Sequence, residues 1–233
     1  MSDPIPVTGL SNAEFFERHA AAGRIGLVGG ALPGNRFIGR AQRHIIEGKE
    51  WSRWSHAFLL QGRRADGHHW VIESDLDVRH KHIRLGVQEN RVEKYHGDDE
   101  YPSVAIVDVG LAPGREQEVV AHALELVAAG ARYSIRELLG TVWAMRRAGG
   151  QARANVLAQE KSFYCSAFVR HVFARASLEL NPGLAEKNTT PEDLWRVTVP
   201  HTKWLLERER KPNMLRRAVG KMKARIAKRR TGG

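Results

Sequence analysis

The sequence predicts an α+β fold in which one sheet packs against several amphipathic helices. Short runs rich in apolar and β-branched residues predict the strands, and most of them lie in the first half of the chain. Apolar residues that recur every three or four positions predict helices before and after those runs. The pair Asp66-Gly67, between two strand-like runs, predicts a hairpin and therefore antiparallel neighbours.

The chain begins with a predicted helix over residues 11–22. Ser11 is a suitable N-cap, and Glu14 follows three positions later, as in a capping box. Residues 23–30 predict a short strand that ends in a glycine-rich turn, and residues 37–47 predict a second helix.

The predicted hairpin carries His56 on its first strand and acidic residues on its second. Its strands are predicted at residues 54–60 and 70–74. A tight turn at Asp66-Gly67 would place His56 opposite Asp77, whereas a wider loop would place it opposite Glu73. In both registers the alternation of side chains puts the two carboxylates on the same face as His56. The residues alone leave both registers open.

Beyond the hairpin the chain is predicted to form further strands and then helices, and one of these strands is strongly apolar. Residues 103–109 form that strand, and we expect it at the centre of the sheet because nearly every residue is apolar. The other predicted elements are strands at 80–87 and 90–95, helices at 115–129 and 133–147, and a short helix from Pro191 that residues 203–210 could extend.

Cys165 is the only cysteine, and it lies near the predicted start of a helix that Ser162 caps. The buried face of that helix is predicted to hold Phe168, Val169, Val172, Phe173 and Ala176. The unpaired N–H groups and the positive end of the helix dipole stabilise a thiolate at such a position. A thiolate is the nucleophile of cysteine enzymes when the fold brings a histidine to it. The alternative is a buried, inert cysteine.

Three short motifs occur in a characteristic order. They are Ser55-His56-Ala57, Val71-Ile72-Glu73 and Tyr164-Cys165-Ser166, supported by Gly130-Ala131-Arg132-Tyr133 and by residues 189–194. In order and spacing they resemble the circularly permuted NlpC/P60, papain-like cysteine hydrolases of the YiiX/YaeF type. The resemblance covers about residues 24–197.

The resemblance implies a permuted papain-like fold, with an antiparallel sheet or small barrel packed against the helix that carries Cys165. It implies that Cys165 is the nucleophile, His56 the base and Glu73 the carboxylate that orients the base. The tighter hairpin register leaves Asp77 as the alternative third residue. The residues expected to bind substrate or form the oxyanion site are Tyr133, Tyr164 and Ser166.

The function that follows is a thiol hydrolase that cleaves a peptide or peptidoglycan-type amide through an acyl-enzyme. The first alternative is a lipid acyl hydrolase or acyltransferase, and the second is a non-catalytic scaffold. We expect no cofactor. The histidine pairs His68-His69 and His80-x-His82 could hold zinc, but the spacing supplies no third and fourth ligand, so no metal site is predicted.

Composition divides the chain into a catalytic domain at residues 1–209 and a basic extension at residues 210–233. Ten of the 37 Lys and Arg residues lie in the extension, which contains no Asp or Glu. The net charge of +11 therefore resides almost wholly in the extension. A single cysteine excludes an internal disulfide, and the N-terminus lacks the basic and apolar regions of a signal peptide. We expect a cytoplasmic protein, peripheral to a membrane if the extension binds one.

The extension has the pattern of a basic amphipathic helix. Its apolar stripe consists of Leu215, Ala218, Val219, Met222 and Ile226. Such a helix can lie on an anionic membrane or follow a nucleic-acid backbone, the less favoured partner. It can equally be a solvated tail or dock on the body of the protein. The sequence does not predict an oligomeric state.

Deleting residues 211–233 should leave turnover of a small soluble substrate unchanged and weaken binding to anionic vesicles. The deletion removes nine of the ten cations, and each contributes about 1 kcal/mol near an anionic surface. Co-sedimentation with vesicles and with DNA across a salt range checks this, because DNA binding should vanish at high salt while apolar insertion persists. Equal binding by the full-length and shortened proteins would contradict it.

Overall fold

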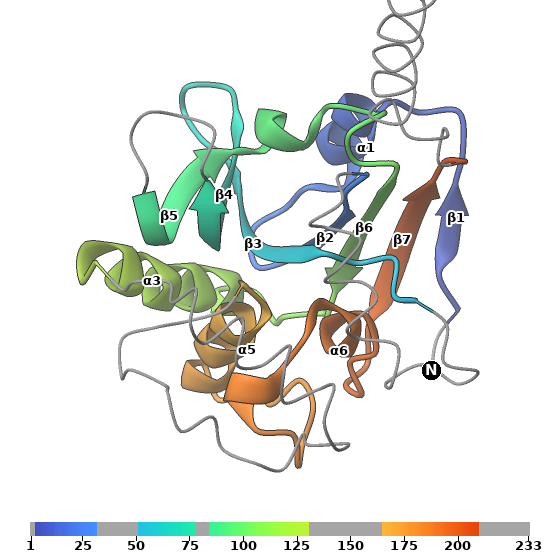
Figure 1. Cartoon of the computed structure of the whole chain (residues 1–233). Coiled ribbons are helices and arrows are strands. Elements are labelled where there is room, and N and C mark those ends of the chain that lie inside the picture. The colour runs from blue at the N-terminus through green and yellow to red at the C-terminus, as the bar shows by residue number, and fades with distance from the viewer. Residues whose placement is uncertain (1–2, 32–50, 78–83, 131–164, 210–233) are drawn as a thin grey trace, which may run out of the picture.

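The computed structural model describes residues 3–31, 51–77, 84–130 and 165–209 (Figure 1). The side chains of residues 75–77, 84–85 and 187 are not described. The predicted helices at 37–47 and 133–147 lie outside the described residues, as do Tyr133, Tyr164 and the basic extension.

Seven strands of the described chain form one mixed sheet. In chain order they are β1 (Ile5–Val7), β2 (Ile25–Gly29), β3 (His56–Arg63), β4 (His69–Asp77), β5 (Arg84–Arg91), β6 (Ser103–Asp108) and β7 (Thr202–Glu207). Their order across the sheet is β1-β7-β6-β2-β3-β4-β5. Only the β1–β7 pair of these ladders is parallel, so the sheet is antiparallel wherever it carries the candidate site.

The helices cover the two faces of the sheet unequally (Figure 1). On one face lie α3 (Arg115–Ala128), α5 (Cys165–Arg175), η3 (Glu186–Asn188) and α6 (Pro191–Trp195). On the other face lie α1 (Asn12–His19) and the 3-10 turn η2 (Val92–Tyr95). No helix in the described ranges is both long enough and apolar enough to cross a bilayer. One sheet with helices on both faces is an α+β fold, as the pattern of strands and helices predicts.

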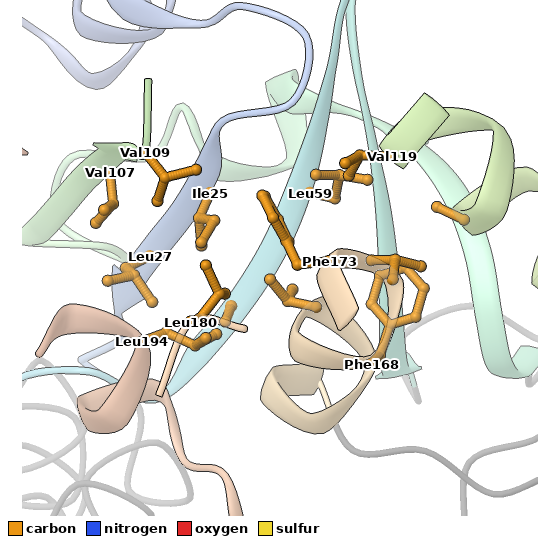
Figure 2. Close-up of a cluster of buried hydrophobic side chains, with 14 of the residues drawn as sticks. Ile25, Leu27, Leu59, Val107, Val109, Val119, Phe168, Phe173, Leu180 and Leu194 are labelled. Carbon is orange, nitrogen blue, oxygen red and sulfur yellow. The ribbon is translucent and has the colours of Figure 1, made fainter. Parts of the chain in front are cut away.

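Alternation along the strands divides the core into two parts. Ile25 and Leu59 point toward α5 and pack with Phe173, as Figure 2 shows. Their neighbours in sequence point the opposite way, and there Phe58 packs beneath α1. The interior strand β6, next to the central strand β2, contributes to both cores and is buried from Ser103 to Val107.

The helix α1 begins as the sequence predicts. The Ser11 hydroxyl accepts a hydrogen bond from the Glu14 backbone N–H at 3.2 Å, and the Glu14 carboxylate accepts one from the Ser11 N–H at 2.7 Å. This capping box satisfies two N–H groups that the start of a helix leaves unpaired. The helix buries Phe15 and Phe16 against the sheet.

The predictions for residues 90–95 and 203–210 are wrong. Residues 90–95 were expected to form a strand, but β5 ends at Arg91 and residues 92–95 form the turn η2. Residues 203–210 were expected to extend a helix, but Thr202–Glu207 is the strand β7. Trp204 of β7 pairs with Ile5 on one side and Ile106 on the other, so partners distant in sequence decide its conformation.

The β3–β4 hairpin adopts neither predicted register. Its loop has three residues, closed by a hydrogen bond from the Arg64 N–H to the His68 carbonyl at 3.0 Å, with Gly67 at a φ of 80°. A β-bulge between Leu60 and Gly62 then shifts the ladder by one residue. Beyond the bulge Leu59 pairs with Ile72.

The strands β3 and β4 separate beyond this point. Their ladder ends at Leu59 and Ile72, while β4 continues to Asp77 along β5 and the start of β3 continues along β2. As a result His56 is directly opposite neither Glu73 nor Asp77. The bulge nevertheless leaves Glu73 on the same face as His56.

Gly26 provides the space for an aromatic side chain next to the candidate site. It pairs with Phe58 on β3, and a Cβ at position 26 would lie 2.0 Å from the Phe58 ring. Only a glycine allows this ring to lie flat over β2. The position of Phe58 thus depends on the absence of a side chain at Gly26.

Gly26→Ala should destabilise the protein by about 1–3 kcal/mol, because the added methyl group overpacks the core and displaces Phe58. Thermal unfolding followed by circular dichroism measures the loss. Gly97→Ala is the matched control, since its Cβ would approach Glu100 Cβ only to 3.3 Å and its φ is negative or extended. Equal melting temperatures for the two variants would contradict the account.

Candidate active site

The centre of the site is the fully buried carboxylate of Glu73, whose side chain is 0% exposed. One oxygen, Oε2, accepts hydrogen bonds from His56 Nε2 at 2.6 Å and from the Tyr95 hydroxyl. The other, Oε1, accepts from Asn90 Nδ2 at 2.7 Å and Lys94 Nζ at 2.8 Å. Both oxygens are thus satisfied, as a buried carboxylate requires.

These contacts keep Glu73 ionised. Burial by itself would raise the pKa of the carboxyl, but the hydrogen bond from His56 and the positive charges of Lys94 and His56 hold the pKa well below its usual range. A permanently charged carboxylate is the form that can hold an imidazole by its N–H.

The donors converge on Glu73 because of the sheet register and a change of direction after β5. Asn90 is paired with Val71, two residues before Glu73, and so shares its face of the sheet. The chain then turns into η2, which brings Lys94 and Tyr95 over the same face. Tyr95 stacks on Phe58 with ring centroids 4.6 Å apart and planes 5° apart.

His56 is the first residue of β3 and lies between the carboxylate and Cys165. Its side chain is 15% exposed, and its ring centroid lies 6.1 Å from that of Tyr95. Because Nε2 faces Glu73, Nδ1 is the ring nitrogen that remains for another partner.

Cys165 supplies that other partner. The thiol is partly exposed at the first described residue of α5, and its charge and hydrogen-bonding capacity are the main influences that raise the pKa of His56. The helix α5 packs on the Leu59 face of the sheet, whereas His56 belongs to the opposite face. The separation of β3 and β4 leaves room for the two side chains to meet.

The pKa of His56 reflects both partners. Burial would lower it, but the charge and hydrogen bond of Cys165, and then those of Glu73, raise the pKa from its ordinary value of 6.5 to about 10. The ring is therefore an imidazolium at neutral pH when it faces a thiolate.

Buried polar contacts fix the helix that carries Cys165. The Ser166 hydroxyl donates to the Thr189 carbonyl at 2.7 Å. Arg170, only 2% exposed, donates to the Thr189 hydroxyl at 3.2 Å and to the Asn181 carbonyl at 2.9 Å. It also forms a two-nitrogen contact with Glu179 at 2.6 and 2.9 Å. These bonds tie the first two turns of α5 to the following loop.

The segment after that loop is locked by a second capping box. Thr190 caps α6, its hydroxyl accepts from the Asp193 N–H at 3.3 Å, and the Asp193 carboxylate accepts from the Thr190 N–H at 2.8 Å. The residues 189–194 that support the family resemblance therefore have a structural role here: they hold the loop against α5.

Of the predicted site residues, the structure brings Cys165, His56 and Glu73 together. Ser166 lies beside them, but its hydroxyl is turned into the protein. The backbone of Asp77 lies at the end of the β4–β5 ladder, four residues beyond Glu73, and its side chain is among those not described.

Three residues at the carboxylate were missed by the sequence analysis. They are Asn90, Lys94 and Tyr95. Lys94 and Tyr95 fell within a stretch predicted as a strand, where alternation would have sent them to opposite faces. A turn predicted at Val92 would have indicated that the side chains of Lys94 and Tyr95 can both face Glu73.

Comparisons with known proteins give one informative result. No family model matches the sequence, and no curated protein matches it. Among solved structures, the chain is similar to YiiX from Escherichia coli O157:H7, described as a metalloprotein of the family DUF1105. The TM-score is 0.51 at 13% sequence identity, over 79% of this chain and 96% of YiiX. The likeness shows a YiiX-like fold.

The candidate site does not offer a metal its usual ligands. Both oxygens of Glu73 already accept hydrogen bonds, and His56 uses Nε2 for Glu73, so only the Cys165 thiolate and one ring nitrogen remain. Within the described ranges, no three His, Cys, Asp or Glu side chains are grouped to hold a metal ion. His68 contacts Glu93, and His80 and His82 lie outside those ranges.

Replacing Cys165 by Ala should lower the pKa of His56. In the wild type the ring should stay protonated until the pH approaches about 10, and the variant should lose the proton at lower pH because the charge and hydrogen bond of Cys165 are gone. NMR of the imidazole nitrogens follows this titration. His19, whose pKa is lowered by burial and by Arg18 and Arg24, is the internal control. An unchanged His56 titration would show that the two side chains do not interact.

Proposed function

We propose that the chain is a thiol hydrolase with a permuted papain-like catalytic domain at residues 1–209. The carrying observation is the convergence of Cys165, His56 and Glu73, which come from α5, β3 and β4. Support comes from the histidine-first order of these residues in the sequence and from the YiiX-like fold. A peptide or peptidoglycan-type amide is the proposed substrate.

In the proposed reaction the Cys165 thiolate attacks the carbonyl carbon of the amide. The C–N bond then breaks, and the His56 imidazolium gives its proton to the departing amine. This leaves a thioester on Cys165. Water attacks the thioester while neutral His56 takes a proton from it, and the carboxylic acid departs as the thiolate and imidazolium form again.

Glu73 acts through His56 in this proposal. Its Oε2 holds Nε2–H, so Nδ1 faces the sulfur, and its charge stabilises the imidazolium. The carboxylate does not take a proton at any step. Its role is orientation, so it can be buried beneath the ring and still act.

The negative oxygen of the tetrahedral intermediate needs hydrogen-bond donors close to Cys165. We assign the backbone N–H groups of Cys165 and Ser166, because groups at the start of a helix have no partner within the helix. The Ser166 hydroxyl cannot serve, since it donates to Thr189. Tyr133 and Tyr164 are the proposed side-chain contacts to substrate.

Cys165→Ala and His56→Ala should each reduce turnover by about a thousandfold or more, because members of such a site act as a unit. Release of nitroaniline from peptide nitroanilides tests the amide proposal, and release of nitrophenol from long-chain esters tests lipid acyl transfer. His171→Ala is the matched control, since His171 lies on the same helix and contacts Glu186. It should retain full activity.

Glu73→Gln should reduce activity and also stability. All four partners of the carboxylate are donors, so the new amide NH₂ group would face donors and Lys94 would lose its counter-charge.

Retention of full turnover by the Cys165→Ala protein would refute the proposal, whatever the behaviour of the other variants.

A further inference from the structure

Two cations share the buried carboxylate of Glu73, one at each oxygen. His56 Nε2 lies 2.6 Å from Oε2, and Lys94 Nζ lies 2.8 Å from Oε1. The carboxylate is 0% exposed, and the Lys94 side chain is 23% exposed. The ammonium therefore enters from the solvent side and neutralises a charge that water does not reach.

Because Lys94 and His56 both contact Glu73, the presence of Lys94 determines which negative group the positive charge of His56 balances. A buried carboxylate that met only the imidazolium would be paired with it charge for charge. An adjacent thiolate would then add a second, unbalanced negative charge in a poorly solvated place. With Lys94 present, Glu73 is balanced by the ammonium, and the imidazolium is available to balance Cys165.

We propose that Lys94 is a charge-balancing and positioning residue, which leaves the positive charge of His56 free to stabilise the Cys165 thiolate. The inference rests on the proposed function and deepens it. Lys94 would not touch the substrate. It would act through Glu73 and His56, by setting the net charge that the thiolate meets.

The other groups around the site do not replace this charge. Asn90 from β5 and Tyr95 from η2 both donate to Glu73, but both are neutral. The nearest cation in sequence, Arg91, contacts Asp66 at 3.3 Å and lies over the Trp70 ring.

Two other ionisable groups lie in or beside η2. Glu93, between Arg91 and Lys94, contacts His68. Burial lowers the pKa of His96, which disfavours its charged form. The groups whose charge and hydrogen bonds raise the pKa of His56 are Cys165 and Glu73, and the ring of Tyr95 also contacts the imidazole. Lys94 reaches this pair through the carboxylate.

The pKa values agree with this arrangement. The charge of Lys94 is a direct cause of the lowered pKa of Glu73, and it stands beside the hydrogen bond from His56. Lys94 is thus coupled to the ring that meets Cys165.

The test is the pH dependence of alkylation of Cys165 by iodoacetamide, a neutral reagent whose rate follows the thiolate fraction. In Lys94→Met the pH at which reactivity rises should move upward by about one unit, because losing a nearby positive charge disfavours the thiolate. Below that pH the variant should react about tenfold more slowly than the wild type.

Three further variants separate charge from packing. Lys94→Arg keeps the charge and has room at a side chain that is 23% exposed, so it should restore the wild-type profile. Arg91→Met removes a cation from the same segment and should change nothing. Tyr95→Phe removes a donor to Glu73 without a change of charge, and its profile should move less than that of Lys94→Met.

The outcomes distinguish this inference from the proposed function. If the wild-type profile matches that of His56→Ala, no histidine activates Cys165 and the proposed function fails. If His56→Ala alters the profile but Lys94→Met does not, the function stands and the Lys94 proposal is overturned. Should Lys94→Met not fold, Lys94→Gln, whose amide can donate to Glu73, gives the same test.

Discussion

The structure around the candidate site depends on the burial of one carboxylate. Removing a carboxylate from water costs several kcal/mol unless charges and hydrogen bonds replace the lost solvation. Glu73 obtains them from His56, Asn90, Lys94 and Tyr95, which belong to β3, β5 and η2. The path of the chain from β4 to η2 is therefore tied to the satisfaction of this group.

The second constraint is that the thiol and the imidazole come from opposite faces of one sheet. The helix α5 is held on its own face by Arg170 and by the bond from Ser166 to Thr189, while Glu73 holds His56 on the other. The contact between Cys165 and His56 thus joins two cores that are otherwise separated by the strands. Each partner is thus held by its own set of hydrogen bonds, independent of the other.

Short-range patterns in the sequence predicted much of this fold. The capping box of Ser11 and Glu14, the buried strand at residues 103–108 and the helix at 115–128 follow from local residue preferences. The strand β7 could not be predicted in this way, because its conformation comes from pairing with β1 and β6. His56, Glu73 and Cys165 could be selected as a set because their three motifs resemble a known family in order and spacing, whereas the residues alone left Glu73 and Asp77 both open. Lys94 and Tyr95 are ordinary residues whose importance arises only when η2 folds over Glu73.

In the hairpin between β3 and β4, the number of residues in the loop and the bulge determines the face of the sheet on which Glu73 lies. Its three-residue loop alone would have sent Glu73 to the face opposite His56, and the single extra residue of the bulge reverses that outcome. The alternation argument from sequence reached the correct face without knowledge of either feature, because the two cancel. The loop itself can change in length, because its residues are unpaired, but the two strand segments between the loop and the site cannot. One residue gained or lost within either segment would exchange the faces and separate the carboxylate from the imidazole, whereas a change of two would leave them together. The evolution of these segments is therefore expected to proceed in even steps, or in compensating pairs.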